Sequence, residues 1–400
     1  MTATVQRRGF GKLYAQVLPM SFSGQKYFSP SGYEPIPPRR FEVERIFLCK
    51  GSLATPEREK FVNKICKLYP QAAIFEREDT PHNRVELQEE SKLALHRKGK
   101  RTLVFGVHQS AVRFAEEEGN SCPNYWHFSP YGFCFYGCKY CYLAGTQGFW
   151  HSPTVKIYVN LDEIIREIER AANKLAQPTA FYLGKLQDGL ALDPLTAYST
   201  VLVPFFAKHK FARQVILSKS AAVDRLLNLD HQGHTILSWS VNPRELVSSF
   251  EENTPLIEER IQAMKKCSAK GYPVRAVLMP IIPVPNWEKI YARFLERLLS
   301  EVHLSRLTLG GICIYKNAKR LMEQKLGPQN DISRQLDTKT KSRDGRVRYG
   351  IDLRIKLYSK LIVIVREIKP DQEIALCLEE PPVWKALNLE YAQGRCNCVL

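Results

Sequence analysis

The chain has 400 residues, of which 44% are hydrophobic and 25% charged, the proportions of an ordinary globular protein. No run of about eighteen apolar residues occurs, which excludes a typical membrane-spanning helix. Eleven cysteines are too few for a disulfide scaffold in a chain of this length and suggest a reducing, cytoplasmic setting. The formal net charge of +17 favours a polyanionic partner such as DNA or RNA.

Residues 1–40 are rich in Gly, Pro, Ser and Tyr without periodicity, which predicts an irregular extension. A small α/β domain is expected over residues 41–120. It begins with a strand at 41–49 and a helix that Thr55 caps and that ends near residue 68. Further strands are expected at 72–75 and 102–107.

From residue 121 to 330 strands alternate with amphipathic helices, which predicts a parallel sheet with right-handed crossovers. Six such units favour a partial TIM-type barrel, and a doubly wound open sheet is the alternative. The strands are expected at 125–129, 180–185, 214–219, 235–241, 274–279 and 307–314, with an extra strand at 155–159. The helices are expected at 160–175, from 193, and at 221–229, 254–271, 287–302 and 318–326.

The last expected unit, residues 331–400, combines a basic hairpin with a C-terminal tail. Residues 338–369 hold ten Lys or Arg against three acids, and an Asp-Gly pair at 344–345 is typical of a hairpin turn. A second basic segment, residues 91–113, holds six Lys or Arg and no acid. Basic segments are often only solvated surface, but two of them flanking a catalytic region favour a track for nucleic acid.

Three cysteines lie in one short aromatic loop with C-x3-C-x2-C spacing: Cys134, Cys138 and Cys141. Three thiolates can hold three irons of a [4Fe–4S] cluster and leave the fourth iron open, whereas clusters that only carry electrons usually take four cysteines. Four-cysteine zinc sites usually use two C-x2-C pairs, and no second pair is present. The spacing therefore favours the open cluster of radical-SAM enzymes, which bind S-adenosylmethionine (SAM), over zinc or unrelated thiols.

Polar residues follow the second, third and fourth barrel strands, at the face where barrel enzymes place their chemistry. Lys219 is the strongest candidate, because an ammonium beside a site that must hold a carboxylate has an electrostatic reason to be there. Each of these residues could instead be a helix cap or a loop residue. The full set is Lys185, Gln187, Asp188, Lys219, Ser240 and Asn242.

With these residues in place, the chain resembles the spore photoproduct lyase family of radical-SAM proteins from about residue 41 to about 349. In the loop the resemblance covers Gly132, Cys134, Gly137, Cys138, Tyr140, Cys141, Tyr142 and Leu143. It continues at 157–160, Asp188, Asp193, Lys219, 240–242, 271–272, 318–320 and 348–350.

The resemblance implies a partial TIM barrel, an oxygen-sensitive [4Fe–4S] cluster, SAM and an electron donor such as flavodoxin or ferredoxin. In the family a 5′-deoxyadenosyl radical takes hydrogen from a thymine lesion in DNA, which then fragments to two thymines. By position Lys219 matches a lysine that contacts SAM, and Ser240, Asn242, Asp188 and Lys185 are further candidates for cofactor binding. Tyr140 and Tyr142 match tyrosines linked to radical transfer, with core packing as the alternative.

The hairpin is similar to a family element that approaches the lesion. Arg348 and Tyr349 carry this match, and the wider set of candidate nucleic-acid contacts is Lys339, Lys341, Arg343, Arg346, Arg348 and Tyr349.

Lys185 departs from the family pattern, because it lines up with a cysteine that donates a hydrogen atom. An ammonium cannot replace a thiol in this role, since its N–H bond is too strong. Either another thiol takes over or the reaction differs. Cys313, expected on the sixth strand, is the candidate catalytic thiol. Cys396 and Cys398 are expected in a frayed surface tail, with a flexible dithiol that reaches the site or binds metal as the alternative.

The remaining cysteines, Cys49, Cys66, Cys122, Cys267 and Cys377, are expected to pack in the core. The sequence therefore favours a radical-SAM lyase acting on a pyrimidine lesion in DNA. The alternatives are the same chemistry on RNA or a small molecule, and a nucleic-acid-binding protein with a structural metal site.

Overall fold

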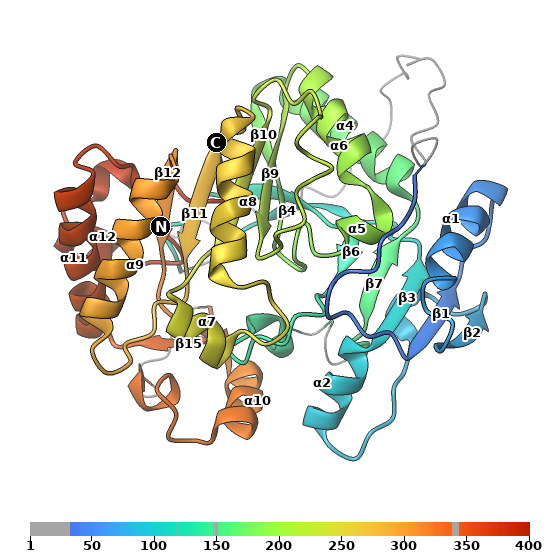
Figure 1. Ribbon diagram of the computed structural model, residues 1–400, viewed down its shortest axis with the longest axis horizontal. Helices are drawn as coiled ribbons and strands as arrows, with labels where there is room; N and C mark the ends of the chain where they lie inside the picture. The colour runs from blue at the N-terminus through green and yellow to red at the C-terminus, as the bar shows by residue number, and fades with distance from the viewer. Residues whose placement is uncertain (1–32, 118, 147, 149–150, 338–343) are drawn as a thin grey trace, which may run out of the picture.

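Parallel strands dominate the computed structural model, which describes residues 33–400 except 118, 147, 149–150 and 338–343. Two large sheets and one small sheet make up the strand framework, and Figure 1 shows helices packed around the outside of the larger one. No helix within the described residues is both long and apolar enough to cross a membrane.

The N-terminal sheet has five strands in the order β2-β1-β3-β7-β6, and all of its pairs are parallel except β6 with β7. The extra strand expected at 155–159 is β7 of this sheet. Helix α1 begins where predicted, since the Thr55 side chain accepts a hydrogen bond from the Arg58 backbone N–H at 3.3 Å. The elements are β1 (Arg45–Cys49), α1 (Pro56–Cys66), β2 (Ala73–Arg77), α2 (Lys92–Lys100), β3 (Thr102–Gly106), β6 (Tyr131–Gly132) and β7 (Val155–Tyr158).

The large sheet has eight strands in the order β16-β12-β11-β10-β9-β8-β5-β4, and only the β4–β5 pair is antiparallel. From β5 to β12 the spatial order follows the chain order, as in the wall of a barrel, whereas a doubly wound sheet reverses its order part-way. The strands are β4 (Val112–Ala115), β5 (Tyr125–Phe128), β8 (Thr179–Leu183), β9 (Ala212–Ser218), β10 (Thr235–Ser240), β11 (Val274–Leu278), β12 (Arg306–Leu309) and β16 (Ile374–Leu376).

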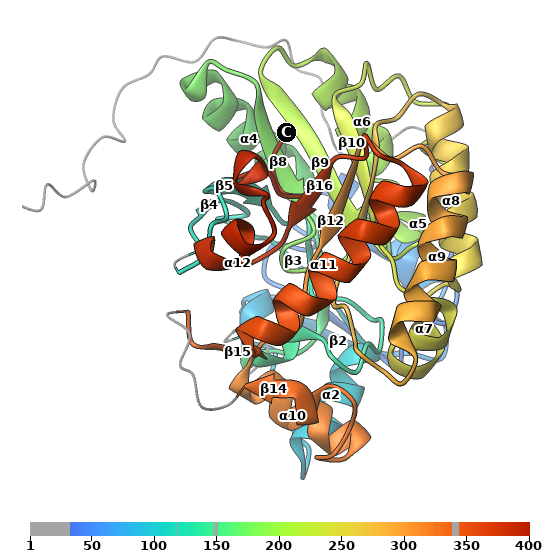
Figure 2. The same cartoon turned by 90° about the vertical axis from the view of Figure 1, so that its left-hand side faces the viewer.

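Amphipathic helices cover the outer face of this wall (Figures 1 and 2). In α4, for example, Ile164, Ile165, Ile168 and Ala172 recur on one buried face, the pattern of a helix with one side on a core. The helices after β7 are α4 (Leu161–Leu175), α5 (Asp193–Thr196), α6 (Ser199–Lys208), α7 (Arg244–Phe250), α8 (Ile257–Ala269), α9 (Trp287–Glu301), α10 (Lys316–Leu326), α11 (Ile351–Ile368) and α12 (Pro381–Ala386). Of these, α10 lies away from the large sheet, against α2.

The expected helix at 221–229 is wrong, because the chain makes successive turns there. The Ser220 hydroxyl accepts a hydrogen bond from the Ala222 N–H at 3.1 Å, and the Ser218 hydroxyl accepts from the Ser220 N–H at 2.8 Å. These local side-chain bonds compete with helical hydrogen bonding at the point where the helix would begin.

The single strand expected at 307–314 is also wrong, since β12 ends at Leu309 and a separate strand, β13 (Cys313–Tyr315), follows. The break falls at Gly310, where a Cβ would lie 2.7 Å from the Met279 sulfur, so the backbone passes closely over β11. β13 belongs to a small antiparallel sheet with β14 (Leu336–Asp337) and β15 (Arg346–Tyr349). Pairing of β14 with β15 forms the base of the expected hairpin, and the Asp344–Gly345 pair lies directly before β15 with a φ of 70° at Gly345. Residues 338–343 lie outside the described residues.

Candidate active site

The cysteine loop is held from two sides. On one side the Phe133 N–H donates to the Leu186 carbonyl, 3.0 Å away, just after β8. On the other, the Gly137 N–H donates to the Glu252 carbonyl and the Lys139 N–H to the Phe250 carbonyl, each at 2.8 Å. A Cβ on Gly137 would lie 2.9 Å from the Glu252 Cβ, so this close approach favours glycine. These contacts fix the loop between the end of β8 and the end of α7.

The three loop cysteines fit an iron–sulfur cluster. Cys138 is buried and Cys134 and Cys141 are half-buried. Burial raises the pKa of Cys138 to about 12, while the Lys219 ammonium acts in the opposite direction. Within the described residues, no three His, Cys, Asp or Glu side chains are placed to share one metal ion. The C-x3-C-x2-C spacing of the three cysteines suits three irons of one [4Fe–4S] cluster with the fourth iron open.

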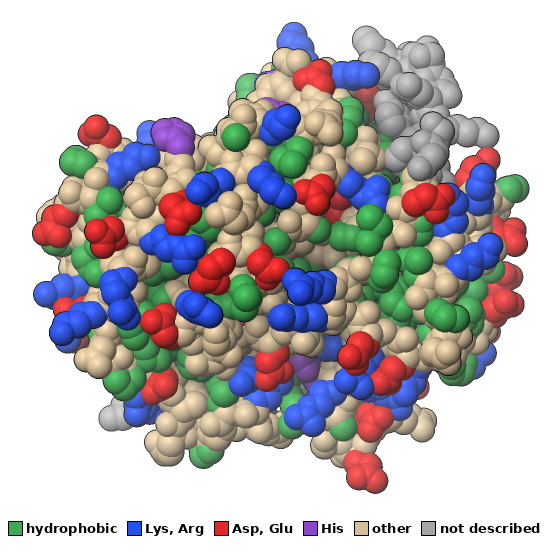
Figure 3. Space-filling view, in the orientation of Figure 1, with side chains coloured by type: hydrophobic (Ala, Val, Ile, Leu, Met, Phe, Trp, Pro, Cys, Tyr) green, Lys and Arg blue, Asp and Glu red, His purple; other side chains and the backbone are tan. Residues whose placement is uncertain are grey.

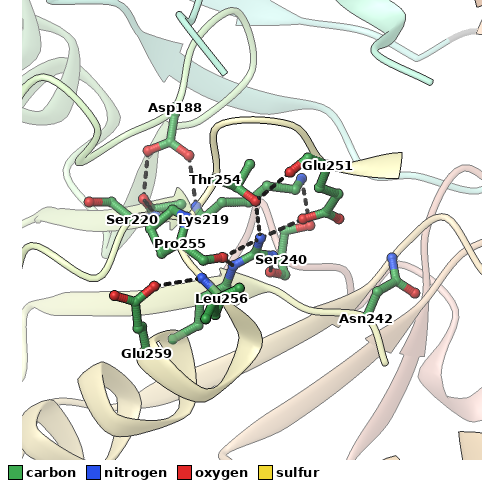
Figure 4. A network of polar contacts seen from close by, with 12 residues as sticks. Asp188, Lys219, Ser220, Ser240, Asn242, Glu251, Thr254, Pro255, Leu256 and Glu259 are labelled. Carbon is green, nitrogen blue, oxygen red and sulfur yellow. Dashed lines mark hydrogen bonds and ion pairs between the residues drawn. The ribbon is translucent and has the colours of Figure 1, made fainter. Parts of the chain in front are cut away.

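Behind the loop lies a buried charged network that the sequence did not indicate (Figure 4). The Tyr140 hydroxyl donates to one oxygen of Glu251, and the Arg260 guanidinium lies 2.5 Å from the other. Arg260 also donates to the Ser240 carbonyl at 3.0 Å and to the Thr254 hydroxyl at 2.7 Å. The network therefore joins the cysteine loop to β10 and α8.

Lys219 lies at the carboxyl end of β9, as predicted for a barrel site residue. Its ammonium donates to the Ser240 hydroxyl at 3.0 Å and stands 5.9 Å from the centre of the Tyr140 ring. Burial alone would lower the pKa of Lys219, but the negative charges of Glu251 and Cys138 outweigh it and raise the pKa. A charged ammonium thus stands beside the cysteine loop, where Figure 4 shows it facing Ser240 and Glu251.

Asp188 and Asn242 already have protein partners. The Asp188 carboxylate accepts from the Ser218 hydroxyl at 2.5 Å and from the Lys219 N–H at 2.7 Å, as well as from two N–H groups of its own loop. Asn242 donates to the Pro280 carbonyl at 3.2 Å and accepts from the Tyr291 hydroxyl at 3.2 Å. Both residues therefore position the strand ends, and direct contact with a cofactor stays a prediction for each.

Lys185 is part of an ion-paired cluster near the site. Its ammonium lies 3.2 Å from Glu117, whose other oxygen accepts from Arg346 at 2.8 Å. The Tyr125 hydroxyl also donates to Glu117, at 3.1 Å. Burial alone would raise the pKa of Glu117, but Arg346 and Lys185 outweigh it and lower the pKa. Glu117, which sequence reasoning missed, thus connects the position of the missing thiol to the hairpin.

The described hairpin residues face the protein. Arg348 binds Asp344, the Asn120 side chain at 2.8 Å and the Leu378 carbonyl at 2.6 Å. Tyr349 is only 1% exposed. Lys339, Lys341 and Arg343 lie outside the described residues. The face in Figure 3 mixes Lys and Arg with Asp and Glu. Contact of the hairpin with nucleic acid therefore stays a prediction.

Of the expected catalytic residues, Tyr142 is exposed and Cys313 is buried. Tyr142 is exposed at the start of a short 3₁₀ turn, Tyr142–Gly145, that follows the last loop cysteine. Cys313 is buried and lies on β13, paired with Arg348 in the small sheet, so the expectation that it lies on the sixth barrel strand is wrong, whereas its catalytic role stays a prediction.

Comparison with known proteins agrees with this geometry. The family model described as spore photoproduct lyase matches residues 41–361. A spore photoproduct lyase from Geobacillus sp. is 33% identical over 291 residues, which cover 71% of this chain and 82% of the relative. One from Bacillus subtilis is 30% identical over 261 residues, covering 64% and 73%.

Solved structures agree as well. Spore photoproduct lyase complexed with dinucleoside spore photoproduct superposes with a TM-score of 0.73 at 24% identity, covering 84% of this chain and 99% of that one. A double mutant with bound AdoMet and the same ligand gives 0.72 at 25% identity, covering 84% and 98%. The chain therefore belongs to the spore photoproduct lyase family of radical-SAM enzymes, with a [4Fe–4S] cluster and SAM as its cofactors.

Proposed function

We propose that this enzyme repairs a pyrimidine lesion in DNA by radical fragmentation, as the names of its relatives indicate for the spore photoproduct. The observation that carries the proposal is the cysteine loop fixed beside the Lys219 ammonium at the carboxyl ends of the barrel strands. Cys134, Cys138 and Cys141 hold the cluster. When bound and reduced, the cluster and SAM supply the 5′-deoxyadenosyl radical.

The protein's own groups have distinct roles in this proposal. Lys219, oriented by Ser240 and by the Asp188 bond to its backbone, attracts the SAM carboxylate. Tyr140, a loop residue held by Glu251, places its ring centre 5.9 Å from the Lys219 ammonium and stays a candidate for radical transfer. The reducing electron comes from a small carrier such as a ferredoxin or flavodoxin. Extrusion of a damaged base costs less than that of an intact one, which contributes to selectivity.

The test is repair of ultraviolet-irradiated DNA by anaerobically reconstituted protein with SAM and dithionite, read by mass spectrometry. We expect loss of the lesion and release of 5′-deoxyadenosine. Cys138→Ala should abolish both, whereas Cys267→Ala, a buried thiol on α8, should leave both unchanged. Intact protein that holds the cluster but cleaves no SAM would refute the proposal.

Lys185 favours a second candidate, the same radical acting on RNA or a small molecule, because no thiol stands at the donor position. SAM cleavage with unchanged DNA lesions would support it.

A further inference from the structure

Four cysteines outside the loop come together from three parts of the chain: Cys122, Cys377, Cys396 and Cys398. The Ser121 N–H donates to the Glu379 carbonyl at 2.8 Å, which places Cys122 beside the segment that follows β16. The Cys398 N–H lies 3.4 Å from the Cys396 sulfur. The Cys377 N–H donates to the Leu309 carbonyl at 2.8 Å, and Arg306 of the same strand, β12, donates to the Cys396 carbonyl at 2.7 Å, so the end of β16 and the tail both lie against β12. Charge on each of the four thiols also acts on the pKa of another of the four. Packing in the core, which was expected for Cys122 and Cys377, stays a prediction for both.

The C-terminal tail that carries Cys396 and Cys398 is docked, so the expectation of a frayed surface end is wrong. Cys396 and Asn397 are each 3% exposed. Arg306 donates to the Cys396 carbonyl at 2.7 Å, and Arg275 donates to the Val399 carbonyl at 2.6 Å. Cys398 packs against the cluster of apolar side chains that includes Tyr125 and Tyr182, so the tail reaches the strands of the barrel wall.

The charges around the tail call for a buried anion. Arg275 and Arg306 are neighbours on β11 and β12, only 5% and 6% exposed. Arg306 has a carboxylate partner, Glu373 at 2.9 Å, but the described residues offer none in ion-pair contact with Arg275. The Arg275 Nε also has no hydrogen-bond partner among them. Glu373 acts on Arg275 only from beyond ion-pair contact, and thiolates at Cys396 and Cys398 would add negative charge beside this buried cation.

The amide of Asn397 gives an independent sign of a missing ligand. This side chain lies between the two tail cysteines, and neither its nitrogen nor its oxygen has a hydrogen-bond partner in the described part of the chain. A buried amide without partners is destabilising and calls for a specific explanation. An amide N–H is a suitable donor to the sulfur atoms of an iron–sulfur cluster, whose potential such bonds adjust.

We propose that Cys122, Cys377, Cys396 and Cys398 bind a second iron–sulfur cluster, separate from the one at the cysteine loop. Four thiolates are the ligand set of a closed cluster, which carries electrons or stabilises structure and leaves no iron open for SAM. Four thiolates also suit zinc, and the metal content of the purified protein distinguishes the two. This inference goes beyond the proposed function and does not depend on it.

The test is metal content, with no need for activity. Anaerobically purified, reconstituted wild type should hold about eight irons and eight sulfides per chain, two [4Fe–4S] clusters. The triple variant Cys134→Ala/Cys138→Ala/Cys141→Ala should keep about four, with the absorbance and electron paramagnetic resonance of a reduced cluster. Cys396→Ser/Cys398→Ser should also keep about four, and Cys267→Ser should keep about eight.

Two results would overturn the inference. One is a triple loop variant that is folded but free of iron after reconstitution. The other is one zinc per chain that the Cys396→Ser/Cys398→Ser variant loses. Because the triple variant leaves the tail intact, it decides the matter even if the tail variant fails to fold, which circular dichroism would reveal. The iron in the triple variant is also independent of SAM cleavage, so failure of this inference is distinguishable from failure of the proposed function.

Discussion

Arg260→Met should unfold the protein more easily and release the cysteine loop. Arg260 and Glu251 form an ion pair whose side chains are both 0% exposed. Without the guanidinium, Glu251 is a buried carboxylate that has lost its ion-pair partner. It keeps the hydrogen bond from Tyr140, and Lys219 is then the charged partner that remains, acting at longer range. Removing one member of a buried pair typically costs about 3–5 kcal/mol, because the other is left uncompensated.

The same change reaches the loop through neighbouring backbone bonds. Glu251 stands between Phe250 and Glu252, whose carbonyls accept from Lys139 and Gly137 at 2.8 Å. A shift of this segment therefore displaces the residues between the first and last loop cysteines. We expect Arg260→Met to lower iron occupancy after reconstitution as well as the free energy of unfolding.

Urea unfolding of wild type, Arg260→Met, Glu251→Gln and the double variant gives a double-mutant cycle, which measures the coupling free energy of the two side chains. The double variant should be more stable than the sum of the single losses predicts, because a neutral amide in place of the Glu251 carboxylate no longer needs the cation. Arg293→Met is the matched control, since Arg293 pairs with Glu245 at 3.4 Å with 72% of its side chain exposed and should cost under about 1 kcal/mol. A loss for Arg260→Met as small as for the control, or strict additivity in the cycle, would refute the reasoning.

Three further predictions concern other elements. Thr55→Ala should lower the free energy of unfolding by about 1 kcal/mol in urea, because α1 loses its cap, and no loss would contradict the capping bond. Asp188→Ala should weaken SAM binding in calorimetry, because the Lys219 backbone loses its acceptor, and unchanged affinity would count against this positioning role. Burial lowers the pKa of Lys156 to about 7 from 10.5, so between these values the unfolded chain binds a proton that the folded chain lacks. The free energy of unfolding of wild type should therefore rise with pH across this window relative to that of Lys156→Met. The same pH dependence of this free energy in both proteins, measured in urea, would refute the prediction.

The run of parallel strands in the large sheet was predictable because its strands are short and apolar and most are followed by an amphipathic helix, so local periodicity specifies them. The turns at 221–229 were not predictable. Backbone hydrogen bonds between residues three apart, together with bonds to serine side chains, favour turns over a helix there. Similarly, 307–314 was expected as one strand although it contains Gly310 and Gly311, and the strand ends where the Gly310 backbone passes close to Met279.

For the site, the spacing of the cysteines and the place of Lys219 at a strand end could be found from the sequence. Glu251 and Arg260 could not, since their pairing depends on how α7 and α8 pack and no local pattern distinguishes them from surface charges. The docked tail was missed for the same reason: its anchors, Arg275 and Arg306, lie at the starts of β11 and β12, far away in the chain.

Lys185 is the residue whose role the sequence left most open, and the structure makes it testable as a charge partner. Glu117 faces Lys185 at 3.2 Å and Arg346 at 2.8 Å, with only 8% of its side chain exposed. Glu117→Gln should therefore cost about 3–5 kcal/mol in urea, since it leaves two cations facing each other, one of them largely buried.

Lys185→Met should cost far less, about 1 kcal/mol, because Glu117 keeps both Arg346 and the Tyr125 hydroxyl and the Lys185 side chain is partly exposed. Glu117 also has a lowered pKa, so its contribution is present above its unfolded pKa and is lost as pH falls through the folded value. If Lys185→Met instead left stability unchanged but abolished SAM cleavage, Lys185 would be a catalytic group rather than a charge partner.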